Sequence, residues 1–379
     1  MHGFARFIIS VWILSFACDS IAETNQWERL NAEVAKCYQQ GDYAQATELA
    51  QQTVKIAEAS FGPEHLNVAK SLNNLALLYK LQGKYAQAKP LYTRALTIKE
   101  KIFGSDHPAV AVSLNNLAEL AKAQGEYTQA HSLYKRALTI RENHFDPNHP
   151  EIAISLNNLA GLYLAQGKYA KAKPLYEQVL TICERAFGPN HPTVAQALNN
   201  LAAVYQAEGK FRQAESVYKR ALAICERIWG KQHPSSAAFL NNLASLYNAE
   251  GKLAEAQKLC QQALKIREKT FGSQHPYVAQ SLNNLGSIYQ AQHKLDEAAS
   301  LYTKALQIWE KTLGPEHPYT ATALNNLALL HYRNRDYAQA ERLFLRALKI
   351  REKTLGFSHP EVIATLENMA QCYLSLIHI

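Results

Sequence analysis

The sequence predicts an all-α protein, a solenoid built from antiparallel helix pairs, and three observations lead to this prediction. The stretch "LNNLA" begins at Leu72 and returns every 42 residues, at Leu114, Leu156, Leu198, Leu240 and Leu324, with "LNNLG" in the copy at Leu282. Apolar residues recur at helical spacing inside each copy, and Gly or Pro stands where a helix should end or begin. A regular period of this length indicates stacked repeats, each a single supersecondary unit.

The period extends beyond these seven copies in both directions. It reaches back to Leu30 in "LNAEVA" and forward to Leu366 in "LENMA". The first half of the repeat is therefore present nine times and the second half eight times. The sequence predicts eight full repeats and a ninth first helix.

One repeat, starting at Pro108, shows why each unit should be a helical hairpin. Leu114, Leu117, Ala118 and Ala121 lie at i, i+3, i+4 and i+7, and Gly125 ends the pattern. A second helical face follows, made of Ala130, Leu133, Tyr134, Ala137, Leu138 and Phe145. Both flanks of such a hairpin are apolar, so we expect stability to come from stacking on the neighbouring repeats.

The N-terminus has the character of an export signal. The short basic stretch "MHGFAR" is followed by the largely apolar run "FIISVWILSFA", which is too short to span a bilayer. Small residues precede a cleavage point after Ala22, so residues 1–22 are predicted to be a signal peptide. We expect a periplasmic or secreted protein. Cys18 leaves open an alternative, a lipid-modified cysteine that anchors the chain.

The last six residues, 374–379, break the repeat pattern. They read "LSLIHI", which back-translates to a sequence resembling a transposase adaptor used in library preparation, and we interpret them as a cloning or assembly scar. The predicted organisation is thus a signal peptide, a repeat solenoid over residues 23–373, and a truncated end. The face of Leu366, Met369 and Tyr373 is expected to be exposed there and to permit self-association.

Composition and motifs exclude several functions. The formal net charge is +8, but Lys and Arg alternate with Glu in every repeat, as in "IREK" and "ICER", which predicts solvated helix surfaces. Neither a basic stripe nor an aromatic stacking platform accompanies the charge, so we do not expect nucleic-acid binding. The sequence contains no "GxSxG", no "HExxH" and no Gly-rich phosphate loop. We expect no enzymatic activity and no cofactor.

Histidine and cysteine residues are interpreted as structural. Pro suits the first position of a helix, so the repeated "GxxHP" indicates where one helix stops and the next starts. Equivalent imidazoles lie a whole repeat apart, which is too far for two of them to bind the same metal ion. These histidines are His107, His149, His191, His233, His275, His317 and His359. Cys183 and Cys225 are also one repeat apart, and we predict free thiols.

The order of large and small residues resembles the tetratricopeptide repeat, in the 42-residue form of kinesin light chains. The residues that carry it in one copy are Leu72, Leu75, Ala76, Tyr79, Ala88, Tyr92 and Ala95. The likeness to kinesin light chains rests on "GxxHP", "LNNLA" and "QGKYAQA". The resemblance implies a right-handed superhelix with first helices on a concave inner surface, and a non-catalytic scaffold for protein–protein interaction. The predicted export signal, and the lack of coiled-coil heptads, argue against a motor role.

The paired asparagines are then candidates for a ligand site. On a helical wheel, Asn74 lies roughly 150° from the centre of the apolar face and Asn73 roughly 110°. The second asparagine of each pair is predicted to line the groove: Asn74, Asn116, Asn158, Asn200, Asn242, Asn284 and Asn326. The first asparagine is predicted to bridge neighbouring helices, with the groove as a secondary role: Asn73, Asn115, Asn157, Asn199, Asn241, Asn283 and Asn325.

Neighbouring positions indicate what the groove would bind. Its centre is polar and nearly uncharged, with Gln196, Gln206, Asn248, Gln280 and Gln290. Lys70, Lys80 and Lys122 make the first repeats basic, with Glu119 opposing them, and Tyr332 marks the far end. We expect an extended or disordered peptide segment of another protein, acidic where it meets the first repeats.

A second hypothesis stays open. The chain could be the recognition arm of a larger exported protein whose C-terminal effector domain, for example a caspase-like peptidase, is missing here. The residues that follow would discriminate, because a scaffold continues with a hairpin and a polar cap, whereas an effector begins a mixed α/β pattern.

Overall fold

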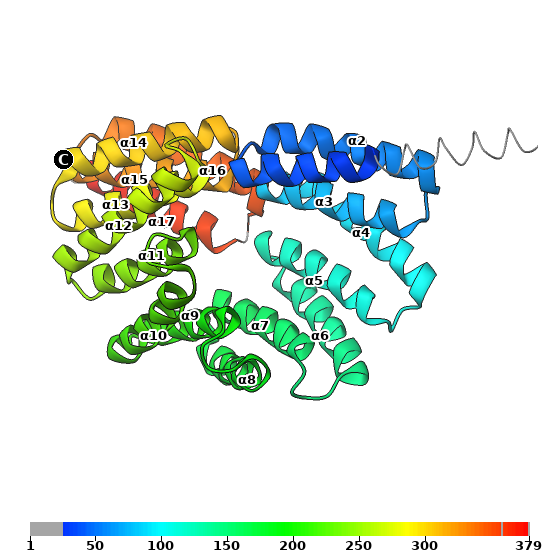
Figure 1. Cartoon of the computed structure of the whole chain (residues 1–379). Helices are drawn as coiled ribbons and strands as arrows, with labels where there is room; N and C mark the ends of the chain where they lie inside the picture. The colour runs from blue at the N-terminus through cyan, green and yellow to red at the C-terminus, as the bar shows by residue number, and fades with distance from the viewer. Residues whose placement is uncertain (1–25, 358, 378–379) are drawn as a thin grey trace, which may run out of the picture. The chain divides into compact units, whose positions relative to one another are not determined.

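A computed structural model describes residues 26–357 and 359–377 of the chain. Every regular element in these residues is a helix, which confirms the predicted all-α class (Figure 1). Residues 26–40 are helical. The helices that follow are α2 (Tyr43–Phe61), α3 (Leu66–Leu81), α4 (Tyr85–Phe103), α5 (Pro108–Ala123), α6 (Tyr127–His144), α7 (Pro150–Ala165), α8 (Tyr169–Phe187), α9 (Pro192–Ala207), α10 (Phe211–Trp229), α11 (Pro234–Ala249), α12 (Leu253–Phe271), α13 (Pro276–Ala291), α14 (Leu295–Thr312), α15 (Pro318–Arg333), α16 (Tyr337–Leu355) and α17 (Pro360–Ile377).

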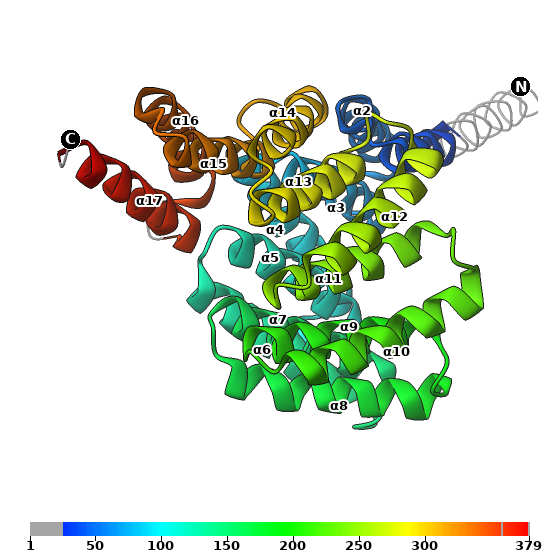
Figure 2. The same cartoon turned by 90° about the vertical axis from the view of Figure 1, so that its left-hand side faces the viewer.

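The chain divides into two compact units, which we describe separately. Unit 1 ends at Ser105 and contains the helix of residues 26–40 with α2, α3 and α4; unit 2 begins at Asp106 and contains α5 to α17. Odd-numbered helices are the first helices of repeats and even-numbered ones the second helices. Within each unit a first helix packs on its own second helix, which packs in turn on the next first helix (Figure 2). The predicted eight repeats and ninth first helix are confirmed.

Histidine begins each first helix from α3 onward, and it does so through its side chain. Nδ1 of His149, for example, accepts a hydrogen bond of 3.2 Å from the backbone N–H of Glu151, and the Phe145 ring stacks on the imidazole at 4.4 Å. An N-cap acceptor satisfies one of the N–H groups that a helix start leaves unpaired. The same bond is made by His65, His107, His191, His233, His275, His317 and His359, which confirms their structural role.

A left-handed residue separates the two helices of each pair. Gly125 and its equivalents hold this conformation at little cost because glycine has no Cβ. His293 and Arg335 occupy the same turn position in the last repeats, with φ of 61° and 63°. A residue with a Cβ is strained in this conformation.

Small residues let the two helices of a pair approach closely. In the pair α5 and α6, Ala118, Ala130 and Tyr134 are fully buried, so the tyrosine ring fills the space beside two alanines. Cys37, Cys183, Cys225, Cys260 and Cys372 are likewise buried in the repeat cores, and all five are free thiols.

The prediction that "IREK" and its relatives form solvated surfaces is wrong for three arginines. Arg141, Arg267 and Arg351 are 2%, 6% and 6% exposed. Each reaches from a second helix to the following first helix, where a hydroxyl or carboxylate group accepts from the guanidinium. Such partners compensate for the burial of the charge. In "ICER" the arginine takes another position, and Arg185 and Arg227 are exposed as predicted.

The two ends of the predicted organisation have different outcomes. Residues 1–22, with Cys18, lie outside the described residues, and α17 continues past Tyr373 to Ile377. Leu366 and Tyr373 are exposed as expected, but Met369 is buried against α16, next to Phe344, so the predicted exposed face is wrong at this residue. Among the described residues, no helix combines the length and hydrophobicity that a bilayer span requires.

Candidate functional site

The first helices of unit 2 form the inner layer of that unit. Successive first helices, such as α7 and α9, contact each other directly. Figure 1 shows α5, α7 and α9 toward the inside of the curve of unit 2, with α6, α8 and α10 outside them. The exposed and half-buried residues of these first helices are called the inner surface below.

Asparagine side chains connect one repeat to the next in both units. The second asparagine of a repeat donates from Nδ2 to Oδ1 of the first asparagine in the preceding repeat. In unit 2 these bonds join Asn200 to Asn157 (2.7 Å), Asn242 to Asn199 (2.8 Å), Asn326 to Asn283 (2.9 Å) and Asn368 to Asn325 (3.5 Å), and in unit 1 Asn74 to Asn31 (3.3 Å). Both members of a pair therefore take part in bridging the repeats.

Burial separates the two members of each predicted pair. The second asparagines, including Asn116, Asn158 and Asn284, are half-buried, so part of each amide faces solvent. Among the first asparagines, Asn115, Asn241 and Asn325 are buried, while Asn73, Asn157, Asn199 and Asn283 are half-buried. Asn241 donates to Ser281 Oγ at 2.9 Å instead. Asn157, Asn199, Asn283 and Asn325 thus accept bridging bonds, while bridging by the other first asparagines and ligand contact by the second asparagines stay predictions.

The other predicted polar residues are held by hydrogen bonds within or between repeats. Tyrosines of second helices donate to the glutamines of their own repeat, Tyr218 to Gln206 (3.2 Å) and Tyr302 to Gln290 (2.9 Å). The remaining bonds are Gln196 to Asn200 (3.1 Å), Asn248 to Ser287 (3.3 Å), Arg267 to Gln280 (3.1 Å) and Tyr332 with Ser375 (3.0 Å). These contacts fix the direction of the amides on the inner surface.

The three predicted lysines do not form one group. Lys70 and Lys80 belong to unit 1, where the Lys70 ammonium lies 5.3 Å from the centroid of the Trp27 ring. Lys122 belongs to unit 2 and forms an ion pair with Glu119 at 2.7 Å. The sequence predicted that Glu119 would oppose the charge of the lysines. Glu119 also accepts from Tyr134, and burial is the main cause that raises the pKa of that tyrosine. The positive charge of Lys122 is thus compensated by the carboxylate of Glu119.

A second feature, missed from the sequence, is the contact where a second helix meets the next first helix. We call it the inter-repeat slot, formed by one position on each helix, fourteen residues apart. Within the two units, the second-helix position holds Ala57, Arg141, Cys183, Cys225, Arg267, Trp309 and Arg351. The first-helix position holds Ser71, Ser155, Ala197, Phe239, Ser281, Ala323 and Thr365.

The residues of a slot are matched in chemistry. Each of the three arginines donates to the hydroxyl opposite it, Arg141 to Ser155 at 2.6 Å, Arg267 to Ser281 at 2.9 Å and Arg351 to Thr365 at 2.6 Å. Where the second helix offers Cys or Trp, the first helix offers Ala or Phe. In unit 1 the slot residue is Ala57, and the Trp27 indole N–H donates to Ser71 at 2.8 Å. In these slots a buried hydroxyl has a donor that reaches it, as buried polar groups generally do.

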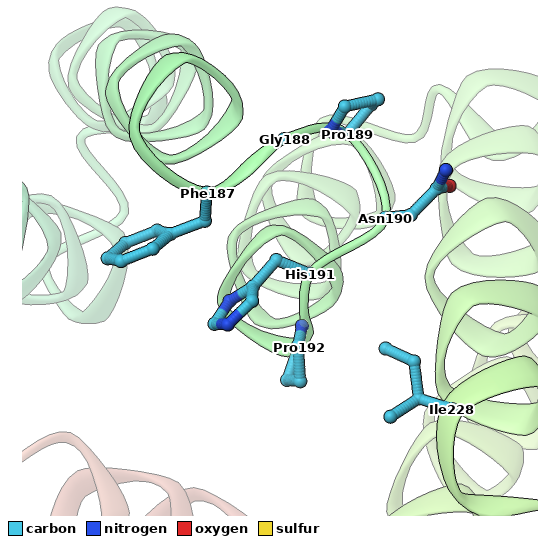
Figure 3. Close-up of a pocket in the computed structure, with 7 residues that line it drawn as sticks. All are labelled: Phe187, Gly188, Pro189, Asn190, His191, Pro192 and Ile228. Atoms are coloured by element: carbon cyan, nitrogen blue, oxygen red, sulfur yellow. The ribbon is translucent and has the colours of Figure 1, made fainter.

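Two hollows lie near α8 and α9 in unit 2. One, of 590 Å³, lies between the loop Phe187–Pro192 and Ile228 of α10. Figure 3 shows Ile228 facing this loop from the neighbouring helix, while the Phe187 ring points to the other side. The second hollow, of 260 Å³, is lined by residues of α7, α8 and α9, Cys183 and Ala197 among them. It therefore occupies an inter-repeat slot.

The described residues offer little chemistry for catalysis. No three or more His, Cys, Asp or Glu side chains in this part of the chain are grouped so that they could hold a metal ion. Burial raises the pKa of the Cys260 thiol to about 12, which disfavours the thiolate that a nucleophile needs. Hydrogen bonds from Lys219 and Tyr247 lower the pKa of Glu215 to about 2, and this surface network joins α10 to the next repeat.

Comparisons with known proteins agree with this architecture. The family model described as "Tetratricopeptide repeat" matches residues 29–101, 81–143, 147–227, 235–307, 277–353 and 319–376. No curated protein sequence matches the chain. Among solved structures, the chain is 31% identical to a putative kinesin light chain from Podosopora anserina with nearly identical TPR-like repeats, covering 54% of this chain and 98% of that one at a TM-score of 0.45.

Two further solved structures extend the comparison. BtubC (BKLC) from P. vanneervenii is 27% identical, with 62% of this chain and 92% of that chain covered and a TM-score of 0.47. A Rap protein is 16% identical, but 93% of this chain and 99% of that chain are covered at a TM-score of 0.55, which shows a shared fold. With the family model matched over most of its length, the chain belongs to the tetratricopeptide repeat family, whose repeats form generally non-catalytic scaffolds that bind other proteins.

Proposed function

We propose that the chain binds an extended segment of another protein along the inner surface of unit 2. The observation that carries the proposal is the set of hydrogen bonds between asparagines of successive repeats. In the repeats of Asn200, Asn242 and Asn326, these bonds hold one half-buried amide in a fixed direction. A row of oriented amides suits a ligand whose own main chain presents a regular series of N–H and C=O groups.

Amide stoichiometry supports this role. A primary amide carries two N–H donors and an oxygen with two lone pairs, and the bond to the preceding repeat uses one donor. Asn242, for instance, donates to Asn199 and is half-buried, so the rest of its amide lies at the surface. Exposed alanines next to the amides, at Ala165, Ala207, Ala249 and Ala291, leave room for a ligand backbone.

The charge of the inner surface indicates the kind of segment. Gln206, Asn248 and Gln290 are neutral and held in place, and Lys122 is paired with Glu119. An uncharged stretch of peptide fits this region better than a strongly charged one, which would lose hydration without gaining a partner. The Rap protein of the same fold was solved in complex with Competence and Sporulation Factor, so a solenoid of this fold holds a partner in that case.

Export of the scaffold is part of the same proposal. It rests on the signal-like residues 1–22, which lie outside the described residues. The alternative, in which the repeats form the recognition arm of a larger exported protein with an effector domain, uses the same binding surface. Both versions therefore share one binding test.

The test is a selection of random peptides from a display library on the full chain, followed by fluorescence-anisotropy measurements with synthetic peptides. We expect the double variant Asn158→Leu, Asn284→Leu to bind the tightest-binding peptide about tenfold more weakly than the wild type. Each lost hydrogen bond to the peptide main chain contributes about 0.5–1.5 kcal/mol to binding. The matched control is Gln178→Leu together with Gln262→Leu, which adds the same groups to exposed second-helix positions. Equal weakening by both double variants, or no selected peptide, would overturn the proposal.

A further inference from the structure

One inter-repeat slot in unit 2 contains a hollow. The slot of Cys183 and Ala197 lies in a space of 260 Å³ between α7, α8 and α9. Its position is the one that the Arg141 side chain fills one repeat earlier. There the guanidinium donates to Glu151 at 2.9 Å and to Ser155 at 2.6 Å.

The hollow follows from a change at three positions of a single inter-repeat slot. Arg141, Glu151 and Ser155 are replaced, 42 residues later, by Cys183, Thr193 and Ala197, and all three replacements line the hollow. The arginine side chain is lost and nothing larger takes its place. Packed protein interiors leave few voids larger than a water molecule, so an opening of this size is a local departure from the repeat pattern.

Neighbouring slots keep their volume by other means. In the following repeat the slot again holds a cysteine, Cys225, but Phe239 stands opposite it and is buried in the same cluster. Two repeats further on, Trp309 is 2% exposed opposite Ala323. Among the slots within unit 2, only that of Cys183 combines a small residue on the second helix with a small residue on the first.

The hollow opens on the inner surface, beside the asparagine bonds. Its rim includes Ile154, which is 46% exposed, and the exposed Gln196. Asn157 lines it and accepts the hydrogen bond from Asn200 at 2.7 Å, while Gln196 donates to Asn200 at 3.1 Å. A peptide main chain held by these amides would therefore pass over the opening.

The walls and the size indicate what fits. Val179 and Phe187 are among the apolar walls, and all ten lining residues are uncharged. Burial raises the pKa of the Cys183 thiol, which keeps this wall neutral. At 260 Å³ the space is smaller than the roughly 300–1,000 Å³ of pockets that enclose a whole small molecule. A single large side chain is the better match.

We propose that this hollow is a specificity pocket for one bulky, uncharged apolar side chain of the segment bound along the inner surface. The inference rests on the proposed peptide binding and adds its sequence preference. The pocket would fix the register of the segment, because the repeated asparagines alone allow a peptide to shift by one repeat. A charged side chain would be rejected, since it would lose its hydration without a partner.

The test uses the full chain, a random-peptide display library and two variants that fill the pocket. Cys183→Arg with Thr193→Glu and Ala197→Ser copies the preceding repeat, and Ala197→Phe copies the residue at position 239 of the following one. The control, Trp309→Arg with Ala323→Ser, exchanges the filler of a slot that is already occupied. Circular dichroism and thermal unfolding check that every variant is folded.

We expect the wild type to select peptides with one bulky apolar residue at a fixed position. Replacing that residue by Ala in the synthetic peptide should weaken binding to the wild type and to the control roughly 10- to 100-fold. The same replacement should change binding to either filled variant less than about twofold. Selected peptides without a common apolar residue, or filled variants that keep the preference, would overturn the pocket while leaving peptide binding intact. Failure to select any peptide would overturn both proposals.

Discussion

The buried Arg141 gives the sharpest test of how successive repeats are joined. Its side chain is 2% exposed, its Nε donates to Glu151 at 2.9 Å and its NH1 group donates to Ser155 at 2.6 Å. Ser155 is fully buried, whereas the Glu151 side chain is 38% exposed. Removal of the arginine therefore leaves the buried Ser155 hydroxyl without its donor, whereas the Glu151 carboxylate can be hydrated by water.

The expected magnitudes follow from this difference. Arg141→Cys should cost about 3 kcal/mol, the lower end of the range for breaking a buried ion pair, because Glu151 can be hydrated. In the wild type, Ser155→Ala removes a hydrogen bond to a charged donor and should cost about 2 kcal/mol. When Arg141→Cys is already present, the same change removes an unpaired buried hydroxyl, so it should be neutral or stabilise by about 1 kcal/mol. The two substitutions should thus be coupled by about 2 to 3 kcal/mol.

The assay is urea unfolding followed by circular dichroism for the wild type, both single variants and the double variant. Repeat arrays can unfold in parts, so hydrogen exchange of the α6 and α7 amides should localise the effect. Ser132→Ala, at an exposed position of α6, is the control. If Ser155→Ala costs the same free energy with and without Arg141→Cys, within about 0.5 kcal/mol, the matching of slot residues has no energetic basis.

Three further predictions concern single positions. Gly286→Ala should cost about 1–3 kcal/mol, because a Cβ would lie 2.8 Å from the Tyr302 ring, whereas Gly161→Ala, whose nearest neighbour would be 3.4 Å away, should be neutral or stabilising. His293→Gly should raise the free energy of unfolding by about 1 kcal/mol, since it relieves a φ of 61°. Protonation of His359 should release the start of α17, so exchange of its amides should quicken as the pH falls.

The sign of the pH effect follows from the environment of His359. Burial is the main cause that lowers the pKa of its imidazole, with Arg351 acting in the same direction and Glu361 against it. The folded state therefore binds fewer protons than the unfolded one, whose histidine titrates near 6.5. The stabilisation is present above about pH 6.5 and is lost as the pH falls through the lowered pKa. His359→Asn, which can cap without titrating, should remove this dependence.

Clear outcomes would contradict these three predictions. Equal effects of Gly286→Ala and Gly161→Ala on the urea midpoint would mean that Tyr302 moves aside at no cost. A decrease in stability for His293→Gly would show that the imidazole makes favourable contacts that exceed the strain. If amide exchange at the start of α17 depends on pH as strongly in His359→Asn as in the wild type, a group other than His359 is responsible for the pH dependence.

Much of the fold could be predicted from the sequence because stacking repeats the same environment every 42 residues. Leu114, Ala118 and Tyr134 lie where the helical periodicity placed them, and all are fully buried. Helix boundaries could also be predicted, because Gly125 and the His–Pro pairs end or start a helix through their own backbone conformation. The capping contact of His149 was not predicted, because the sequence shows the proline at the helix start but not the direction of the imidazole.

The candidate site was less predictable because its contacts join neighbouring repeats. A helical wheel describes one helix at a time, so it separated the two asparagines of a pair by direction. The structure instead bonds Asn200 to Asn157, 43 residues away and on another helix. Arg141 was misplaced for the same reason: a charged residue is expected at the surface unless its partners are known, and its partners lie on α7.

A signal for these contacts was nevertheless present in the sequence, in the differences between repeats rather than in their common pattern. Within unit 2, slot residues change together: arginine faces Ser or Thr, whereas Cys183 faces Ala197 and Trp309 faces Ala323. Covariation within one chain reports contact because each repeat is a separate solution to the same packing problem. The slot of Cys183, where the exchange does not conserve volume, contains the hollow on the inner surface. The incomplete packing in the slot of Cys183 lowers the stability of the free protein, and a bound side chain that occupies the hollow would offset this loss.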